Sequence, residues 1–384
     1  MAGTASNGTF CRLCGAWRGS YGLEPTIELY VEHTVAIFRE VKRVLRADGV
    51  LFLNLGDSYA SQGGPLKEGG GINDILGGKK ETQDYNRSRQ APVGLKPKDL
   101  CGIPWRVALA LQADGWWLRS DIIWAKPNPM PESCTDRPTT AHEHIFLLTK
   151  SSRYFYDAEA VREPQAQGTF DRYKPGEKIP TFNKMGGSGR KNQSFADATP
   201  VAILPNGRNL RSVWTIATAP FPSAHFATFP QAIPERCIKA GTSEKGCCPK
   251  CGAPWRRVVE KGELKEHPDR RGRKDRNKAD FDGIDYAVRE STLGLVRETT
   301  TAGWFPTCTH MDFQNLEQHD RPFPEPIPCT VLDIFSGAGT TALVSAKLGR
   351  DAIGIELNPE YVEMSRKRIA GEMGMLCEVS IEPP

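Results

Sequence analysis

The sequence lacks a long hydrophobic run and carries little excess charge. The 384-residue chain contains no apolar stretch of about eighteen residues, the length that spans a bilayer, and its amino terminus does not read as a signal peptide. We therefore expect a soluble, cytoplasmic protein. The formal net charge is only +4, so a surface for nucleic acid would have to concentrate its lysines and arginines locally.

Two common phosphate-binding signatures are missing as well. The glycine turn at Gly337-Ala-Gly339 continues as Thr-Thr-Ala, so the dinucleotide motif G-x-G-x-x-G is absent, and no Walker lysine follows the turn. These absences argue against a nucleotide that is held mainly by its phosphates.

The carboxyl-terminal part instead contains the pattern strand, glycine turn, helix, strand, acid. Val331 to Ile334 and Ala352 to Ile355 are apolar runs of strand length, and we expect the second to be buried. Residues Thr340 to Leu348 have helical character, with Gly349 as a C-cap. Glu356 follows the second strand, where a carboxylate can accept both hydroxyls of a ribose. S-adenosylmethionine, which has a ribose but no phosphate, suits this pattern best.

These motifs resemble those of a known enzyme family. Asp333-Ile-Phe-Ser-Gly-Ala-Gly-Thr-Thr341 with Gly354-Ile-Glu-Leu-Asn-Pro-Glu-Tyr361 resembles the cofactor motif of amino-group DNA methyltransferases, which make N4-methylcytosine or N6-methyladenine. Its position near the carboxyl terminus resembles the permuted β-type order. Earlier segments agree, namely Arg43–Asp57, Asp121–Pro131 and His142–Lys150. The resemblance implies an α/β, Rossmann-like S-adenosylmethionine-dependent methyltransferase fold that flips its target base out of DNA.

The resemblance also implies the cofactor-binding residues. His225-Phe-Ala-Thr-Phe-Pro230 resembles the segment that closes over the cofactor in this family. The candidate set is Asp333, Phe335, Ser336, Gly337, Gly339, Thr340, Thr341, Glu356 and Asn358, with His225, Phe226 and Thr228 as a second group.

The catalytic signature of the family is not found. That signature is an acid, Asn or Ser, followed by Pro-Pro and Tyr or Phe, and it should end a strand before the helix expected at residues 27–46. No Pro-Pro-aromatic sequence occurs in the chain, so the catalytic residues are unknown. Because Gly22-Leu-Glu-Pro-Thr26 resembles the lead-in to that helix, the missing strand is expected upstream of Met1. Asp57-Ser-Tyr59 is the nearest imitation, but it follows the wrong strand and lacks both prolines.

Eleven cysteines without an export signal indicate reduced thiols and metal ligation rather than disulfides. Cys248-Pro-Lys-Cys251 resembles a zinc-ribbon knuckle, and Cys308-Thr-His310 can complete a tetrahedral structural zinc site. The alternative is a set of free surface thiols. Cys11 and Cys14 repeat the knuckle pattern without evident partners.

We expect six segments in the chain. They are an amino-terminal segment (1–25), the catalytic-side half (26–160, with a loop at 59–96), a basic loop region (161–212), a cofactor-lid segment (213–246), a zinc-ribbon-like insertion (247–310) and the S-adenosylmethionine-binding half (325–376). The two loop regions supply Lys and Arg for phosphates and Asn and Gln for base edges, so they are candidates for contacting double-stranded DNA.

The leading hypothesis is a site-specific DNA methyltransferase of a bacterial or phage-infected cell, with a cognate restriction endonuclease as a candidate partner. A catalytically inactive relative that binds DNA or cofactor is one alternative, supported by the missing signature. A methyltransferase for RNA or a small molecule is the other. The sequence does not distinguish cytosine from adenine as the target base.

Overall fold

The chain folds as two units, and the computed structural model describes residues 9–60, 94–164, 207–219, 229–266, 295–310, 323–374 and 377–382. The first unit comprises residues 1–155 and 212–223, and the second comprises residues 156–211 and 224–384. No helix in these described ranges is long and apolar enough to cross a membrane.

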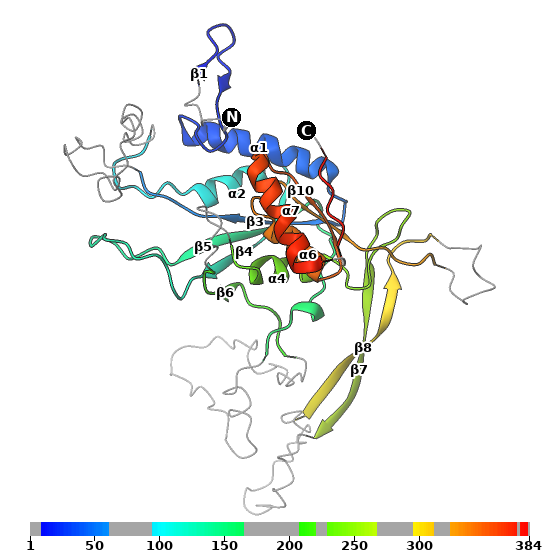
Figure 1. Ribbon diagram of the computed structural model, residues 1–384. Helices are drawn as coiled ribbons and strands as arrows, with labels where there is room; N and C mark the ends of the chain where they lie inside the picture. Colours follow the sequence, from blue (N-terminus) through cyan, green and yellow to red (C-terminus); the bar gives the residue numbers. More distant parts are fainter. Residues whose placement is uncertain are drawn as a thin grey trace, which may run out of the picture. The chain divides into compact units, whose positions relative to one another are not determined.

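Two helices pack together in the first unit (Figure 1). Helix α1 (Ile27–Val44) buries Ile27, Thr34, Phe38 and Val41, and helix α2 (Ile103–Ala113) buries Pro104, Val107, Ala108 and Leu111. The helix expected at residues 27–46 is confirmed. Thr26 is its N-cap, and its hydroxyl accepts a hydrogen bond from the Leu29 amide at 3.2 Å.

Replacing Thr26 with alanine should lower the free energy of unfolding by about 1 kcal/mol, because the capping hydrogen bond at the start of α1 is lost. Urea unfolding of the full-length chain measures this cost. Thr26→Ser keeps the acceptor and should stay close to the wild type. Equal losses in the two variants would show that the hydroxyl does not stabilise the helix.

The sheet of the first unit has the order β3-β5-β4-β6. Its strands are β3 (Val50–Leu55), β4 (Trp117–Ala125), β5 (His142–Thr149) and β6 (Val213–Thr215). Strands β4 and β5 are antiparallel, with Ile122 opposite Ile145. Strand β5 is the buried centre, where Ile145, Phe146 and Leu148 have no exposed surface.

Strands β3, β4 and β6 run in the same direction, since β3 and β4 are each antiparallel to β5 and β6 is parallel to β4. Their carboxyl ends therefore meet at one edge of the sheet, which we call the carboxyl edge. A short antiparallel hairpin precedes α1 in the same unit, and its two strands, β1 (Thr9–Phe10) and β2 (Trp17–Arg18), have two residues each.

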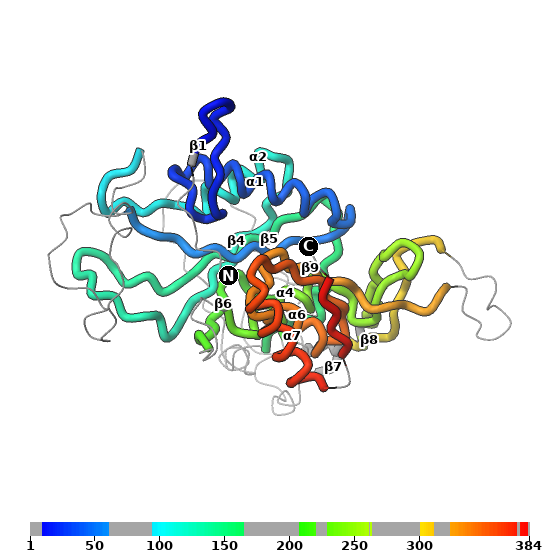
Figure 2. Tube along the Cα trace, turned by 45° about the horizontal axis from the view of Figure 1, so that its top comes forward, coloured from blue at the N-terminus to red at the C-terminus, as the bar shows by residue number. Residues whose placement is uncertain are grey.

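The second unit contains the expected strand–turn–helix–strand. Strand β9 (Thr330–Asp333) and strand β10 (Asp351–Gly354) are parallel, and helix α6 (Thr340–Lys347) connects them. Helix α6 packs against α4 (Ala232–Gly241) and α7 (Pro359–Met373), and α6 lies beside α7 in both ribbon and tube views (Figures 1 and 2). Gly349 follows the helix with φ +69°, as expected of a residue that ends a helix.

One expectation about this unit is wrong. The second strand was expected to be buried, but all four residues of β10 are exposed. Within the described residues β10 pairs with no strand other than β9. An apolar run indicates a strand, whereas its burial depends on which elements pack against it.

A long antiparallel hairpin also belongs to the second unit. It consists of β7 (Trp255–Glu266) and β8 (Leu295–Pro306), and Trp255 pairs with Pro306 at its base. Arg257 at this base forms an ion pair with Asp157 at 3.0 Å, near the short 3-10 helix η2 (Glu159–Val161).

Candidate cofactor site and metal centre

The turn between β9 and α6 is a tight elbow with two left-handed glycines. Gly337 has φ +51° and Gly339 has φ +72°, a region that side chains rarely adopt. The Ser336 amide donates to the carbonyl of Ile355 at 3.0 Å, and the Gly339 amide donates to the carbonyl of Ser336 at 2.9 Å. The elbow is thereby fastened to the chain that follows β10.

Glu356 lies directly against this elbow. Its Oε2 accepts the Gly337 amide at 2.8 Å, and its Oε1 accepts the Asn358 amide at 2.8 Å. A carboxylate offers about four acceptor positions, so two remain for the hydroxyls of a ribose. A Cβ at Gly337 would meet nothing closer than 3.9 Å, which leaves open space at the elbow. The residues therefore fit the adenosine end of S-adenosylmethionine.

Asp333 braces the elbow from the end of β9. Its Oδ1 accepts the Phe335 amide at 3.0 Å, and its Oδ2 accepts the Thr341 hydroxyl at 2.6 Å. Phe335 is 52 % exposed, so its ring is accessible from solvent. Asn358 caps α7 by accepting the Glu360 amide at 3.0 Å.

The structure thus joins Asp333, Glu356 and Asn358 to the candidate residues of the elbow in one hydrogen-bonded group. Thr340 is the exception, because it is buried and its hydroxyl accepts from Arg368 at 3.0 Å, on the side of α7. His225, Phe226 and Thr228 lie outside the described residues.

Two residues of α7 that support the elbow were not predicted. Arg368 also donates to the carbonyl of Ala338 at 3.1 Å. Ser365 lies so close to Gly339 that a Cβ there would sit 1.9 Å from its Oγ. Their spacing of three residues places both on one face of α7, but only the packing of α7 on α6 brings that face to the elbow.

The carboxyl edge of the first unit carries a second polar group. Asn54 at the end of β3 donates to Glu143 Oε2 at 2.7 Å, and Lys126 after β4 forms an ion pair with Glu143. The loop after β4 is joined to the loop after β6, because Asn128 Oδ1 accepts the Thr218 amide at 3.0 Å. This edge is where open α/β sheets bind ligands.

Asp57, which only weakly resembles a catalytic residue, has a structural role at this edge. Its Oδ1 accepts the amides of Ser58 at 2.8 Å and Ile103 at 3.1 Å, and the latter contact holds the start of α2. Tyr59 stacks under the Arg137 guanidinium, with the Arg137 Cζ 3.7 Å from the ring centroid.

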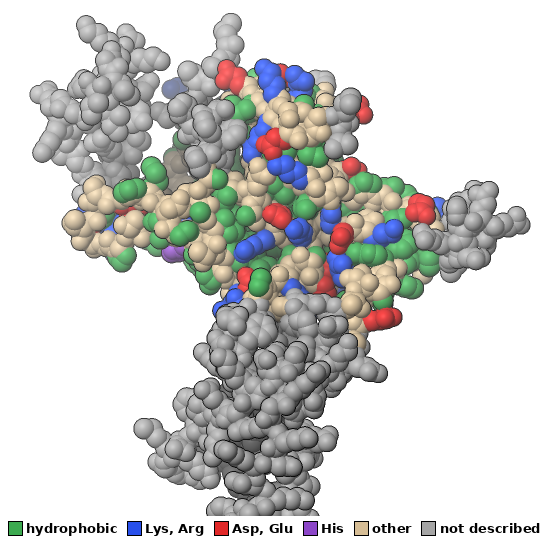
Figure 3. Space-filling model, turned by 60° about the horizontal axis from the view of Figure 1, so that its bottom comes forward, with side chains coloured by type: hydrophobic (Ala, Val, Ile, Leu, Met, Phe, Trp, Pro, Cys, Tyr) green, Lys and Arg blue, Asp and Glu red, His purple; other side chains and the backbone are tan. Residues whose placement is uncertain are grey.

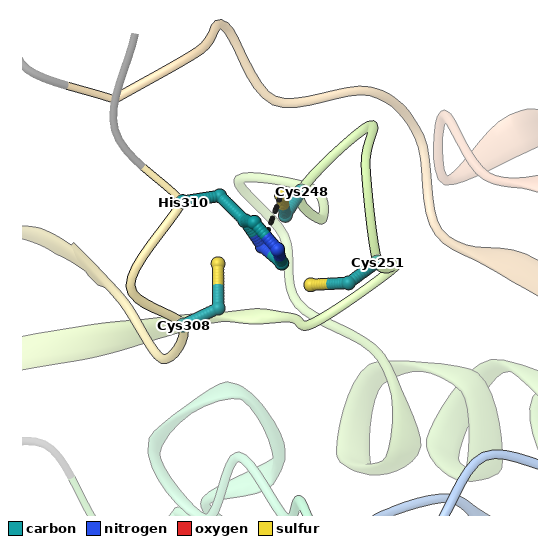
Figure 4. Close-up of side chains that lie close together, drawn as sticks. All are labelled: Cys248, Cys251, Cys308 and His310. Atoms are coloured by element: carbon teal, nitrogen blue, oxygen red, sulfur yellow. Dashed lines mark hydrogen bonds between the residues drawn. The ribbon is translucent and has the colours of Figure 1, made fainter.

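The four predicted metal ligands gather at the base of the β7–β8 hairpin (Figure 4). Cys248, Cys251, Cys308 and His310 place their ligand atoms within 4.8 Å of one another. Cys248 is buried, Cys251 and Cys308 are half-buried, and His310 is exposed. None of the eleven cysteines forms a disulfide.

The Cys248 thiol lies in an environment that favours its ionised form. Burial acts to raise its pKa, but the backbone amides of Cys251 and Lys250 donate to the sulfur, and the pKa lies below the ordinary value. The Cys308 pKa is raised, mainly by burial and also by the neighbouring Cys248 and Cys251 thiols.

A comparison with protein families identifies the family of this chain. The model of a family described as DNA methylase matches residues 8–248 and 329–367, well over half of the chain. The chain belongs to this DNA methylase family. The matched ranges leave out residues 249–328, which contain the β7–β8 hairpin.

Relatives of this DNA methylase cover most of its length. The Type II methyltransferase M.SmaI of Serratia marcescens is 32 % identical over 91 % of this chain and 77 % of its own. M.XycI of Xanthomonas campestris pv. cyanopsidis is 34 % identical over 94 % of this chain and 77 % of its own. A solved structure of the PvuII DNA methyltransferase, described as cytosine-N4-specific, covers 91 % of this chain and 77 % of that one. The two structures superpose with a TM-score of 0.43 at 13 % sequence identity.

Family membership confirms several predictions made from the sequence. The DNA methylase is an enzyme that methylates an amino group in DNA, and S-adenosylmethionine is its methyl donor. The described part of the chain agrees with the predicted α/β class, since β9 and β10 are parallel strands connected by helix α6.

Proposed function

We propose that this chain is a site-specific Type II DNA methyltransferase whose elbow at Gly337 to Gly339, with Glu356, binds S-adenosylmethionine. The acceptor is the exocyclic amine of cytosine (N4) or adenine (N6). The observation that supports the site assignment is the hydrogen bond from the Gly337 amide to Glu356, because it brings the Glu356 carboxylate into direct contact with the elbow.

The donor supplies an electrophilic methyl carbon on a sulfonium sulfur. Glu356 would accept the ribose hydroxyls with its remaining lone pairs, and the ring of Phe335, in the same elbow, is exposed. Asp333 accepts hydrogen bonds from the Phe335 amide and the Thr341 hydroxyl, which tie the two ends of the elbow together. These residues orient the donor, since a fixed geometry contributes to rate by removing rotational freedom before the reaction.

The target base must leave the duplex, because its amine is otherwise inaccessible to the methyl carbon. We assign recognition of the extruded base to the carboxyl edge of the first unit, where Asn54, Lys126 and Glu143 form a hydrogen-bonded group. The loop after β4 carries two ion pairs, Lys98 with Asp136 at 2.6 Å and Glu132 with Arg137 at 2.6 Å.

The contacts to duplex DNA are assigned to the two predicted loop regions, 59–96 and 161–212, most of which lie outside the described residues. On the face seen in Figure 3, lysine and arginine side chains lie among aspartates and glutamates. A mixed surface of this kind is compatible with the modest net charge and with DNA binding concentrated on loops.

The names of the relatives also support a biological setting. M.SmaI and M.XycI are Type II methyltransferases, so we propose a cognate restriction endonuclease as the functional partner and the cytoplasm as the compartment.

Incubation of the purified chain with unmethylated DNA and methyl-labelled S-adenosylmethionine should transfer label to DNA and not to RNA of the same sequence. Digestion to nucleosides followed by mass spectrometry then identifies N4-methylcytosine or N6-methyladenine. Binding of the cofactor without incorporation would favour the inactive relative, for which the missing Pro-Pro-aromatic sequence is the support. Transfer to RNA alone would refute DNA as the substrate.

A further inference from the structure

The four-ligand cluster joins the two ends of one hairpin. Cys248 and Cys251 lie just before β7, and Cys308 and His310 lie just after β8. The hairpin between them falls within residues 249–328, outside the ranges matched by the DNA methylase family. The cluster therefore lies at the base of a segment that the family model does not match.

The backbone around Cys248 has the form of a metal knuckle. The Gly252 amide donates to the carbonyl of Cys248 at 2.7 Å, the Cys248 amide donates to the carbonyl of Ala253 at 2.9 Å, and Gly252 has φ +68°. Both sulfurs of this turn belong to the four-ligand cluster. Zinc bound at Zn–S distances of about 2.3 Å requires ligand atoms about 3.5 to 3.8 Å apart. The Cys248 Sγ and His310 Nδ1 are 3.8 Å apart.

We propose that Cys248, Cys251, Cys308 and His310 bind one structural zinc ion that fastens the base of the β7–β8 hairpin. Three thiolates and one imidazole complete a tetrahedral site with no position left for water or substrate, so the ion is not catalytic. The knuckle is itself anchored, because Cys247 exchanges two backbone hydrogen bonds with Ile327, of 2.8 and 2.9 Å. Ile327 leads directly into β9, so the zinc ion ties the hairpin to the strand that carries the elbow.

The chain offers a matched control in its amino-terminal hairpin. Cys11 and Cys14 form the same turn: the Gly15 amide donates to the carbonyl of Cys11 at 2.9 Å, the Cys11 amide donates to the carbonyl of Ala16 at 2.7 Å, and Gly15 has φ +71°. In the described part of the chain, however, no group of three or more ligands forms around this pair. A knuckle alone supplies two ligands, and the site at the β7–β8 hairpin supplies four.

Elemental analysis of the full-length protein after gel filtration should find about one zinc per chain. Cys251→Ser and Cys308→Ser should each lose it, while Cys14→Ser, the same change in the same turn, should retain it. Cobalt substitution of the wild type should give the visible bands of a tetrahedral thiolate site, a readout that does not depend on any variant folding. Absence of zinc from the wild type, or its retention in both Cys251→Ser and Cys308→Ser, would overturn the proposal.

The fastening role has a separate test. Chelation of the zinc should speed proteolytic cleavage within residues 251–308 by about tenfold or more, because cleavage follows the population of the opened segment. Unchanged cleavage after complete removal of zinc would contradict that role. Neither measurement depends on DNA methylation, so either result is independent of the proposed enzymatic function.

Discussion

Replacing Glu356 with alanine should weaken S-adenosylmethionine binding by about 100-fold or more, measured by titration calorimetry. Two hydrogen bonds from ribose hydroxyls to a charged acceptor contribute about 1.5 to 3 kcal/mol each, and tenfold in affinity corresponds to about 1.4 kcal/mol. The alanine variant also leaves the amides of Gly337 and Asn358 without this acceptor, which loosens the elbow.

Two variants separate these effects. Glu356→Gln keeps an acceptor of the same shape but removes the charge, so its affinity should fall between those of the wild type and Glu356→Ala. Glu360→Ala removes an exposed acid of the same region whose side chain faces solvent, and it should bind the cofactor normally. If Glu356→Ala binds as tightly as the wild type while remaining folded, the assignment of the cofactor site is wrong.

Replacing Gly339 with alanine should lower the free energy of unfolding by about 3 kcal/mol. A left-handed backbone costs a residue with a Cβ about 1 to 2 kcal/mol, and overpacking typically adds about 1 to 3 kcal/mol. The added Cβ would lie 1.9 Å from Ser365 Oγ and 2.8 Å from Ser365 Cβ, so α6 and α7 would have to move apart. Urea unfolding measures the loss.

Gly337 provides the comparison for this prediction. It also has a positive φ, but a Cβ there would meet nothing within 3.9 Å. Gly337→Ala should therefore cost only the backbone term, about 1 to 2 kcal/mol. Ser365→Gly should recover part of the loss in Gly339→Ala, since it removes the clashing atoms. Equal costs at the two glycines, with no recovery, would show that helix packing does not explain the requirement for Gly339.

Local patterns predicted much of this protein because they act over a few residues. The Thr26 hydroxyl accepts a backbone amide at the start of α1, and Gly349 follows the end of α6 with a positive φ. The sequence Cys-x-x-Cys-Gly-Ala forms the same turn at Cys11 and at Cys248. In each case the deciding interactions lie within about five positions along the chain, where residue type and spacing are sufficient.

The exposure of β10 could not be read from the sequence. Ala352 to Ile355 is apolar, and that property alone predicted burial. Burial depends on which strands and helices lie alongside, and β10 pairs with β9 alone among the described residues. The support that Ser365 and Arg368 give the elbow was missed for a similar reason, because it depends on how α7 packs on α6.

The amino-acid sequence by itself determined the class of the protein, since the elbow, the acid beyond it and the two cysteine knuckles are short motifs whose chemistry follows from residue type. Only the tertiary structure decided which groups meet. It paired the strands as β3-β5-β4-β6, placed Glu356 on the Gly337 amide, and closed Cys308 and His310 onto one knuckle rather than the other. Two knuckles of equal local geometry differ in the number of candidate ligands around them, because long-range packing, which local spacing does not encode, brings further ligands to only one of them within the described chain.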